Sequence, residues 1–140
     1  MEPTHQPFTP ASASRTLPLV SRIVLEAIEL KREWRAAIHR FELLQVEADT
    51  GAESAAAREA RRDAEGLAGR IDGCLEELAQ VGCRMRDLER GLVEFPAELE
   101  GRPVLLSWQV GESEVAHWYE REDGPTERRP LDDLFALWGS

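Results

Sequence analysis

The stretch IVLEAIELKREWRAAIHRFELLQVEADTG, residues 23–51, decides the fold, because its apolar side chains recur with a period of about 3.5 residues until a clear break. The stripe consists of Ile23, Ala27, Leu30, Trp34, Ala37, Phe41, Leu44 and Ala48. Such a stripe predicts a long amphipathic helix. The polar triplet Asp49-Thr50-Gly51 predicts where that helix ends.

A second stripe with the same period follows the break. It consists of Ala57, Ala60, Ala64, Leu67, Ile71, Cys74, Leu78 and Val81. When the chain is folded back around Thr50–Gly51, the two stripes match in register, with Leu30 opposite Ile71 and large side chains facing small ones near the tip. The sequence therefore predicts an antiparallel, coiled-coil-like helical hairpin over residues 9–49 and 52–81.

The beginning of the first long helix carries more apolar residues than a two-helix seam uses. These residues are Leu19, Val20, Val24, Leu25 and Ile28. Two partners for this surplus are open: the C-terminal part of the chain, or a second copy in a homodimer. Ahead of it, Thr9-Pro10 predicts a helix cap followed by a first-turn proline, and the helix restarts at Thr16-Leu17-Pro18.

The C-terminal third changes from a helical period to the alternation of β-strands. The predicted strands are Cys83–Asp87, Leu92–Phe95 (ending at Pro96), Val104–Val110 and Glu114–Glu120. The apolar residues after Pro130 predict a short closing helix. We expect one α+β domain over residues 1–140, in which the hairpin leads into a small antiparallel β-meander over 82–140 with a short C-terminal helix.

The composition excludes several classes of protein. The net charge of −10 argues against binding to nucleic acid or to an anionic membrane surface. Two cysteines form neither a disulfide framework nor a zinc site, and no apolar run is long enough to span a membrane. No secretory signal is visible, so we expect a cytoplasmic protein, and no cofactor or metal is indicated.

Several polar and aromatic residues of the predicted β-meander are candidates for a binding site. They are Arg86, Asp87, Glu94, Trp108, Glu112, His117, Trp118 and Arg129. In the functional interpretation, the charged groups converge beneath the two tryptophans, with His117 as a base or ligand group. In the structural interpretation, the tryptophans are core, the charges are solvated, and His117 is a half-buried strand residue.

The tip of the predicted hairpin is acidic, with Glu47, Asp49 and Glu53. A long hairpin with carboxylates at its tip and a β-domain at its base is similar in outline to the bacterial transcript-cleavage factors. Those factors insert such a tip into the RNA polymerase channel and hold Mg²⁺ there. No motif is shared, so this is a remote alternative based on fold-level analogy.

The segment GCRMRDLERGLVEFPA, residues 82–97, resembles an uncharacterised bacterial family, domain of unknown function 2203. The likeness continues through Gly101, Val104, Leu106, Trp108, Gly111-Glu112, Val115 and Trp118 to Arg129-Pro130-Leu131, and includes Phe8-Thr9-Pro10 and Leu17-Pro18. The resemblance implies no particular reaction. The chain departs from the family pattern at Ser107, Tyr119 and Glu94, where the family tends to have Cys, His and Asp. Any thiolate and imidazole chemistry at these positions would therefore be lost here.

These observations favour a non-enzymatic cytoplasmic interaction module that forms a homodimer. The alternative is a small-molecule-binding or hydrolytic domain with a polar site in the Trp-bearing β-meander.

Overall fold

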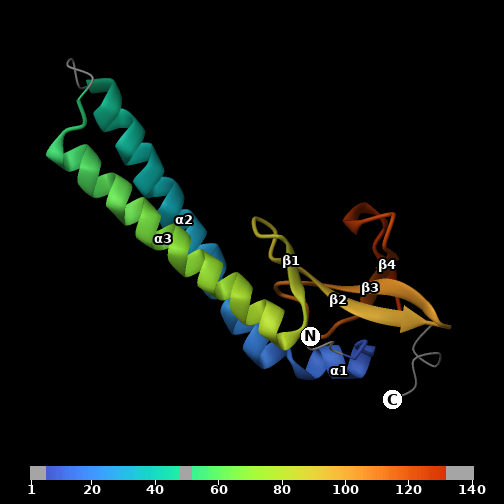
Figure 1. Cartoon of the computed structure of the whole chain (residues 1–140). Helices are drawn as coiled ribbons and strands as arrows, with labels where there is room; N and C mark the ends of the chain where they lie inside the picture. Colours follow the sequence, from blue (N-terminus) through green and yellow to red (C-terminus); the bar gives the residue numbers. More distant parts are fainter. Residues whose placement is uncertain (1–5, 48–51, 132–140) are drawn as a thin grey trace, which may run out of the picture.

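The computed structural model describes residues 6–47 and 52–131, which form the predicted α+β arrangement (Figure 1). The helices are α1 (Pro10–Arg15), α2 (Leu17–Glu47) and α3 (Ala55–Val81), followed by the strands β1 (Arg84–Asp87), β2 (Leu92–Leu99), β3 (Arg102–Gln109), β4 (His117–Glu120) and β5 (Arg129–Pro130), with the 3-10 turn η1 (Pro125–Glu127) between β4 and β5. No helix in the described ranges combines the length and the apolar character needed to cross a membrane.

Local capping defines the helix ends near the positions that the sequence predicts. Thr9 caps α1 in a reciprocal capping box with Ser12, and Pro10 occupies the first turn. Ser54 caps α3, which therefore begins after the predicted residue 52. Gly82 ends α3 in the left-handed conformation, with φ 109°, which favours glycine because it has no Cβ.

Helices α2 and α3 lie side by side and project beyond the sheet as a hairpin (Figure 1). The predicted stripes form their seam: Ala27, Leu30 and Ala37 of α2 and Ala60 and Ala64 of α3 are buried. Arg40 pairs with Asp63, and the Cys74 thiol lies 3.5 Å from Glu26, both close to the predicted register.

The five strands form one antiparallel sheet in sequential order, as expected for a meander. The β2–β3 hairpin turns on Glu100 and Gly101, which both have positive φ (53° and 79°). This two-residue turn suits the right-handed twist of the flanking strands. It sets the register that pairs Leu99 with Arg102 and Leu92 with Gln109.

The predicted end of a strand at Pro96 is wrong, because β2 continues to Leu99. The Pro96 carbonyl accepts a hydrogen bond from the Phe8 amide at 2.8 Å. Proline has no backbone N–H, and at this position an N–H would point to the same side of β2 as the carbonyl. The pairing of β1 with β2 has already ended there, at Glu94, so the proline removes no hydrogen bond from the sheet.

The predicted returning strand is shorter than expected, because β4 contains only His117–Glu120. The preceding residues are held by other partners: the Val115 amide donates to Ser14 Oγ at 2.9 Å, and the Ala116 carbonyl accepts from the Leu131 amide at 3.0 Å. The predicted closing helix falls at residues 132–140, which lie outside the described residues.

The main core lies between the beginning of α2 and one face of the sheet. Val20 and Val24 of α2 are fully buried, in one cluster with Phe95, Leu106 and Trp108. The apolar surplus of α2 is therefore covered largely by the sheet of the same chain. Leu19 and Leu25 are the exceptions, with exposed fractions of 41% and 54%.

Candidate functional site

The face of the sheet opposite this core carries a polar row that crosses four strands. Strand pairing places Arg84 opposite Glu94, Glu94 opposite Ser107, and Ser107 opposite His117. Directly opposite residues in neighbouring strands project from the same face. Because side chains alternate along a strand, this face is the reverse of the one that carries Trp108.

Glu94 is the centre of this row, and its side chain is almost completely buried, with an exposed fraction of 2%. One carboxylate oxygen accepts a hydrogen bond from Arg84 Nη2 at 2.7 Å, and the other accepts one from the Tyr119 hydroxyl and lies 3.7 Å from Arg86 Nε. Burial, together with the hydrogen bond to Glu94, raises the pKa of Tyr119 well above its ordinary value. The phenol therefore stays protonated and donates to the carboxylate.

A recess of about 360 Å³ opens above Glu94. It is bordered by Gly82, Cys83, Arg84, Arg86, Glu94, Pro96, Leu105, Arg121 and Gly124, and we call it the sheet-face recess. Arg121 and Gly124 belong to the loop between β4 and η1. This loop passes close to β1, because a Cβ on Gly124 would lie 3.7 Å from Arg86 Nη2. The recess is thus formed by the sheet on one side and a loop on the other.

Arg128, which follows η1, anchors the whole β4–β5 connection to the sheet through a hydrogen-bond network. Its guanidinium donates to Ser107 Oγ (2.9 Å) and Ser107 O (3.2 Å), and to both carboxylate oxygens of Glu112 (3.1 and 2.8 Å). Glu112 Oε1 also accepts from the Gln109 amide at 2.8 Å. Burial alone would raise the pKa of Glu112, but the hydrogen bonds from Arg128 and Gln109 outweigh it and lower that pKa.

His117 lies at the edge of this network. Its Nδ1 is buried and has no hydrogen-bond partner within the described part of the chain, and it lies 3.6 Å from Glu112 Oε2. Ser107, His117 and Glu112 are the residue types of a hydrolytic triad, but Ser107 is completely buried and its Oγ already accepts from Arg128. A substrate therefore cannot reach this hydroxyl in the arrangement described.

Cys83, which borders the recess, is similarly unsuited to nucleophilic chemistry. Burial raises the pKa of its thiol to about 12, and the thiol donates to the Leu78 carbonyl at 3.6 Å. Since the thiolate is the reactive form, a protonated buried thiol is inert. In the described ranges, no group of three or more His, Cys, Asp or Glu side chains is placed to hold a metal ion.

The structure distributes the eight predicted site residues over different places. Glu94 and Arg86 border the recess, and Glu112 and His117 belong to the neighbouring Arg128 network. The other four lie elsewhere. Asp87 accepts from the Arg90 amide at 3.3 Å in the β1–β2 turn, Trp108 and Trp118 lie in the core on the reverse face, and Arg129 stacks over Trp118 and pairs with Asp123.

Several residues of the site are absent from the sequence-based set, among them Arg84, Tyr119, Arg121 and Arg128. The predicted strands contain a signal for one of them, since pairing residues 83–87 with 92–95 brings Arg84 beside Glu94. The three positions at which the chain departs from the family pattern, Glu94, Ser107 and Tyr119, also lie together in this site. Glu94 is paired with Ser107 and is hydrogen-bonded to Tyr119.

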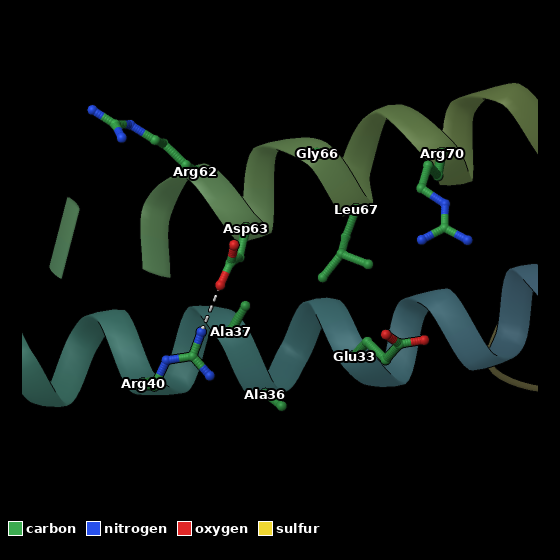
Figure 2. Close-up of a pocket in the computed structure, with 9 residues that line it drawn as sticks. All are labelled: Glu33, Ala36, Ala37, Arg40, Arg62, Asp63, Gly66, Leu67 and Arg70. Atoms are coloured by element: carbon green, nitrogen blue, oxygen red, sulfur yellow. Dashed lines mark hydrogen bonds and ion pairs between the residues drawn. The ribbon is translucent and has the colours of Figure 1, made fainter. Parts of the chain in front are cut away.

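A larger groove of about 590 Å³ lies between α2 and α3 (Figure 2). Ala36, Ala37, Gly66 and Leu67 line it together with charged residues. Arg40 is already paired with Asp63 across the groove, whereas Arg62 points away from α2 (Figure 2). No buried polar group lies among its lining residues, so the sheet-face recess is the better candidate.

The hairpin tip falls largely outside the described residues, which include neither Asp49 nor the side chain of Glu47. Glu53 is described, and it forms two hydrogen bonds with Arg61, at 2.8 and 3.0 Å. Its pKa is lowered, chiefly by these hydrogen bonds. This carboxylate is thus already engaged by a cation of its own chain.

Fold and site together define an α+β protein with a projecting helical hairpin and a charged recess on the outer face of a five-stranded meander. The chain belongs to the family described as an uncharacterized conserved protein (DUF2203), whose model matches residues 6–131. The resemblance seen in the sequence is thereby confirmed. No curated protein and no solved structure matches the chain.

Proposed function

We propose that the protein binds a small molecule in the sheet-face recess and does not catalyse a reaction on it. The observation that carries this proposal is the buried carboxylate of Glu94 at the floor of an open recess, held by Tyr119 and Arg84 and flanked by Arg86. The volume of about 360 Å³ is within the range of small-molecule sites.

Stability alone does not account for this arrangement. Burying the Glu94 carboxylate costs desolvation, while the side chain of its partner Arg84 is 68% exposed, so the cluster is weakly justified as a folding device. A fixed, desolvated polar group beneath an opening is instead a typical means of orienting a ligand. The protonated Cys83 and the inaccessible Ser107 favour binding over covalent catalysis.

Native mass spectrometry of gently purified protein tests the proposal. Leu105→Trp places a large side chain in the recess, and Leu43→Trp is the matched control on the exposed hairpin. We expect wild type and the control to carry a discrete extra mass that the Leu105 variant lacks. Bare wild-type protein, or the same extra mass on all three, would count against the proposal.

A homodimer is a second candidate function, and the exposure of Leu19 and Leu25 on α2 favours it. Large exposed apolar side chains are suited to contact with a second copy. Light scattering coupled to size-exclusion chromatography measures the mass directly. We expect a dimer that Leu25→Glu dissociates. A monodisperse wild-type monomer at high micromolar concentration contradicts the dimer.

We also assign the protein to the cytoplasm. Cys74 and Cys83 are both free and buried, as expected where thiols are kept reduced.

A further inference from the structure

The charged residues that border the sheet-face recess are three arginines and one glutamate. They are Arg84, Arg86, Arg121 and Glu94. Glu94 pairs with Arg84 and Arg86 as a carboxylate. Three positive charges and one negative charge give this set a formal charge of +2. A local excess of cations stands out in a chain whose net charge is −10. Two negative charges on a ligand would neutralise the recess.

Most of the donors on these arginines remain available. A guanidinium has five N–H donors in a planar fork. Arg84 uses Nη2 for Glu94, and the nearest approach of Arg86 to Glu94 is 3.7 Å. Arg121 makes no hydrogen bond or ion pair with a residue in the described ranges. Three arginines with free guanidinium donors therefore border one opening.

Glu94 contributes selectivity rather than attraction. Its carboxylate holds Arg84 by a hydrogen bond and lies beside Arg86, which orients both guanidinium groups before a ligand arrives. It also repels anions, so a ligand with one charge gains little over water. A ligand with two charges on neighbouring oxygens engages more than one guanidinium and outweighs this repulsion.

We infer that the ligand of the sheet-face recess is a doubly charged oxyanion, a phosphomonoester or a dicarboxylate, held by Arg84, Arg86 and Arg121. This inference rests on the proposed function and specifies the ligand class of the same site.

Isothermal titration calorimetry at pH 8 and constant ionic strength tests the charge requirement. Inorganic phosphate, which carries about two charges at that pH, glycerol phosphate and succinate are compared with acetate. We expect at least one dianion to bind about tenfold or more tightly than acetate, as expected for one additional charge-assisted contact. Tighter binding of the two phosphates identifies a phosphoryl ligand, and tighter binding of succinate identifies a dicarboxylate.

Two arginine variants test the location. Arg121→Gln removes a free guanidinium at the recess, while Arg102→Gln removes an exposed arginine of the same sheet that pairs with Glu120 outside it. We expect the first to weaken dianion binding about tenfold and the second to leave it unchanged. The comparison of ligands on wild-type protein remains decisive if a variant folds poorly.

Two outcomes overturn the inference. Acetate that binds as tightly as every dianion would contradict the charge requirement. The absence of dianion binding, alongside an extra mass that disappears in Leu105→Trp, would show that the recess binds a ligand of another class. In the second case the proposed function stands and only the inference about charge fails.

Discussion

Arg128→Ala removes the guanidinium that ties the β4–β5 loop to the sheet. The side chains of Arg128 and Glu112 have exposed fractions of only 19% and 26%, and four hydrogen bonds join Arg128 to Glu112 and Ser107. In the described part of the chain, the variant leaves the Glu112 carboxylate with the Gln109 amide as its remaining hydrogen-bond donor, and it leaves the buried Ser107 hydroxyl without the cation. The loss is therefore one of a partly buried, multiply bonded ion pair.

Removing one partner of a fully buried charge pair costs about 3–5 kcal/mol, and exposed pairs contribute about 0–1 kcal/mol. The Arg128–Glu112 pair is partly accessible, so we expect Arg128→Ala to lower the free energy of unfolding by about 2–3 kcal/mol. With a urea m-value of about 2 kcal/mol/M, the unfolding midpoint would fall by about 1–1.5 M.

Urea titration followed by tryptophan fluorescence measures this change. Arg129→Ala is the matched control, because the neighbouring arginine is 47% exposed and its ion pair with Asp123 is longer, at 3.3 Å. We expect the control to cost less than about 1 kcal/mol. Equal losses for the two variants, or a loss below about 0.5 kcal/mol for Arg128→Ala, would refute this account of the loop.

Three further predictions concern other parts of the β-region. Gly91 and Gly101 both have positive φ (65° and 79°), but only at Gly91 would a Cβ clash, at 2.7 Å from Val110 Cγ1. In urea titrations we therefore expect Gly101→Ala to lower the free energy of unfolding by about 1 kcal/mol and Gly91→Ala to lower it by about 2–4 kcal/mol. Equal losses would contradict the close approach of Gly91 to Val110. Because the pKa of Glu112 is lowered by folding from 4.5, its contribution to stability is present above about pH 4.5 and is lost as the pH falls through the folded-state pKa. Urea titrations between about pH 7 and 3 should thus show a weaker acid dependence for Glu112→Gln than for wild type, and identical slopes would disprove the shift. Finally, burial raises the pKa of Cys83 to about 12. A thiol reagent at neutral pH should therefore modify this residue only when the protein unfolds, and rapid labelling of the native protein would contradict this prediction.

The helical hairpin was predictable because it depends on a local period. The stripes that include Leu30 and Ala60 lie in the seam, and the cap at Thr9 and the end at Gly82 carry short-range signals. The extension of β2 past Pro96 was not predictable in the same way. It depends on Phe8, distant in sequence, occupying the side of the strand where the proline lacks a donor.

The candidate site was only partly predictable, for a similar reason. Strand alternation separates Glu94 from the face of Trp108 only once the pairing of Glu94 with Ser107 is known, because the two residues belong to different strands. Arg128, in contrast, lies in a loop without periodicity and contacts Ser107 of β3. Such a contact is set by the path of the loop and leaves no local pattern to read.

Backbone chemical-shift mapping tests most directly whether the sheet-face recess binds a ligand. Labelled protein is titrated with a deproteinised cell extract and, separately, with inorganic phosphate. We expect the shifted amides to cluster on β1 and β2 around Glu94 and at Gly124. Shifts confined to the groove between α2 and α3, or no shifts with either addition, would contradict it.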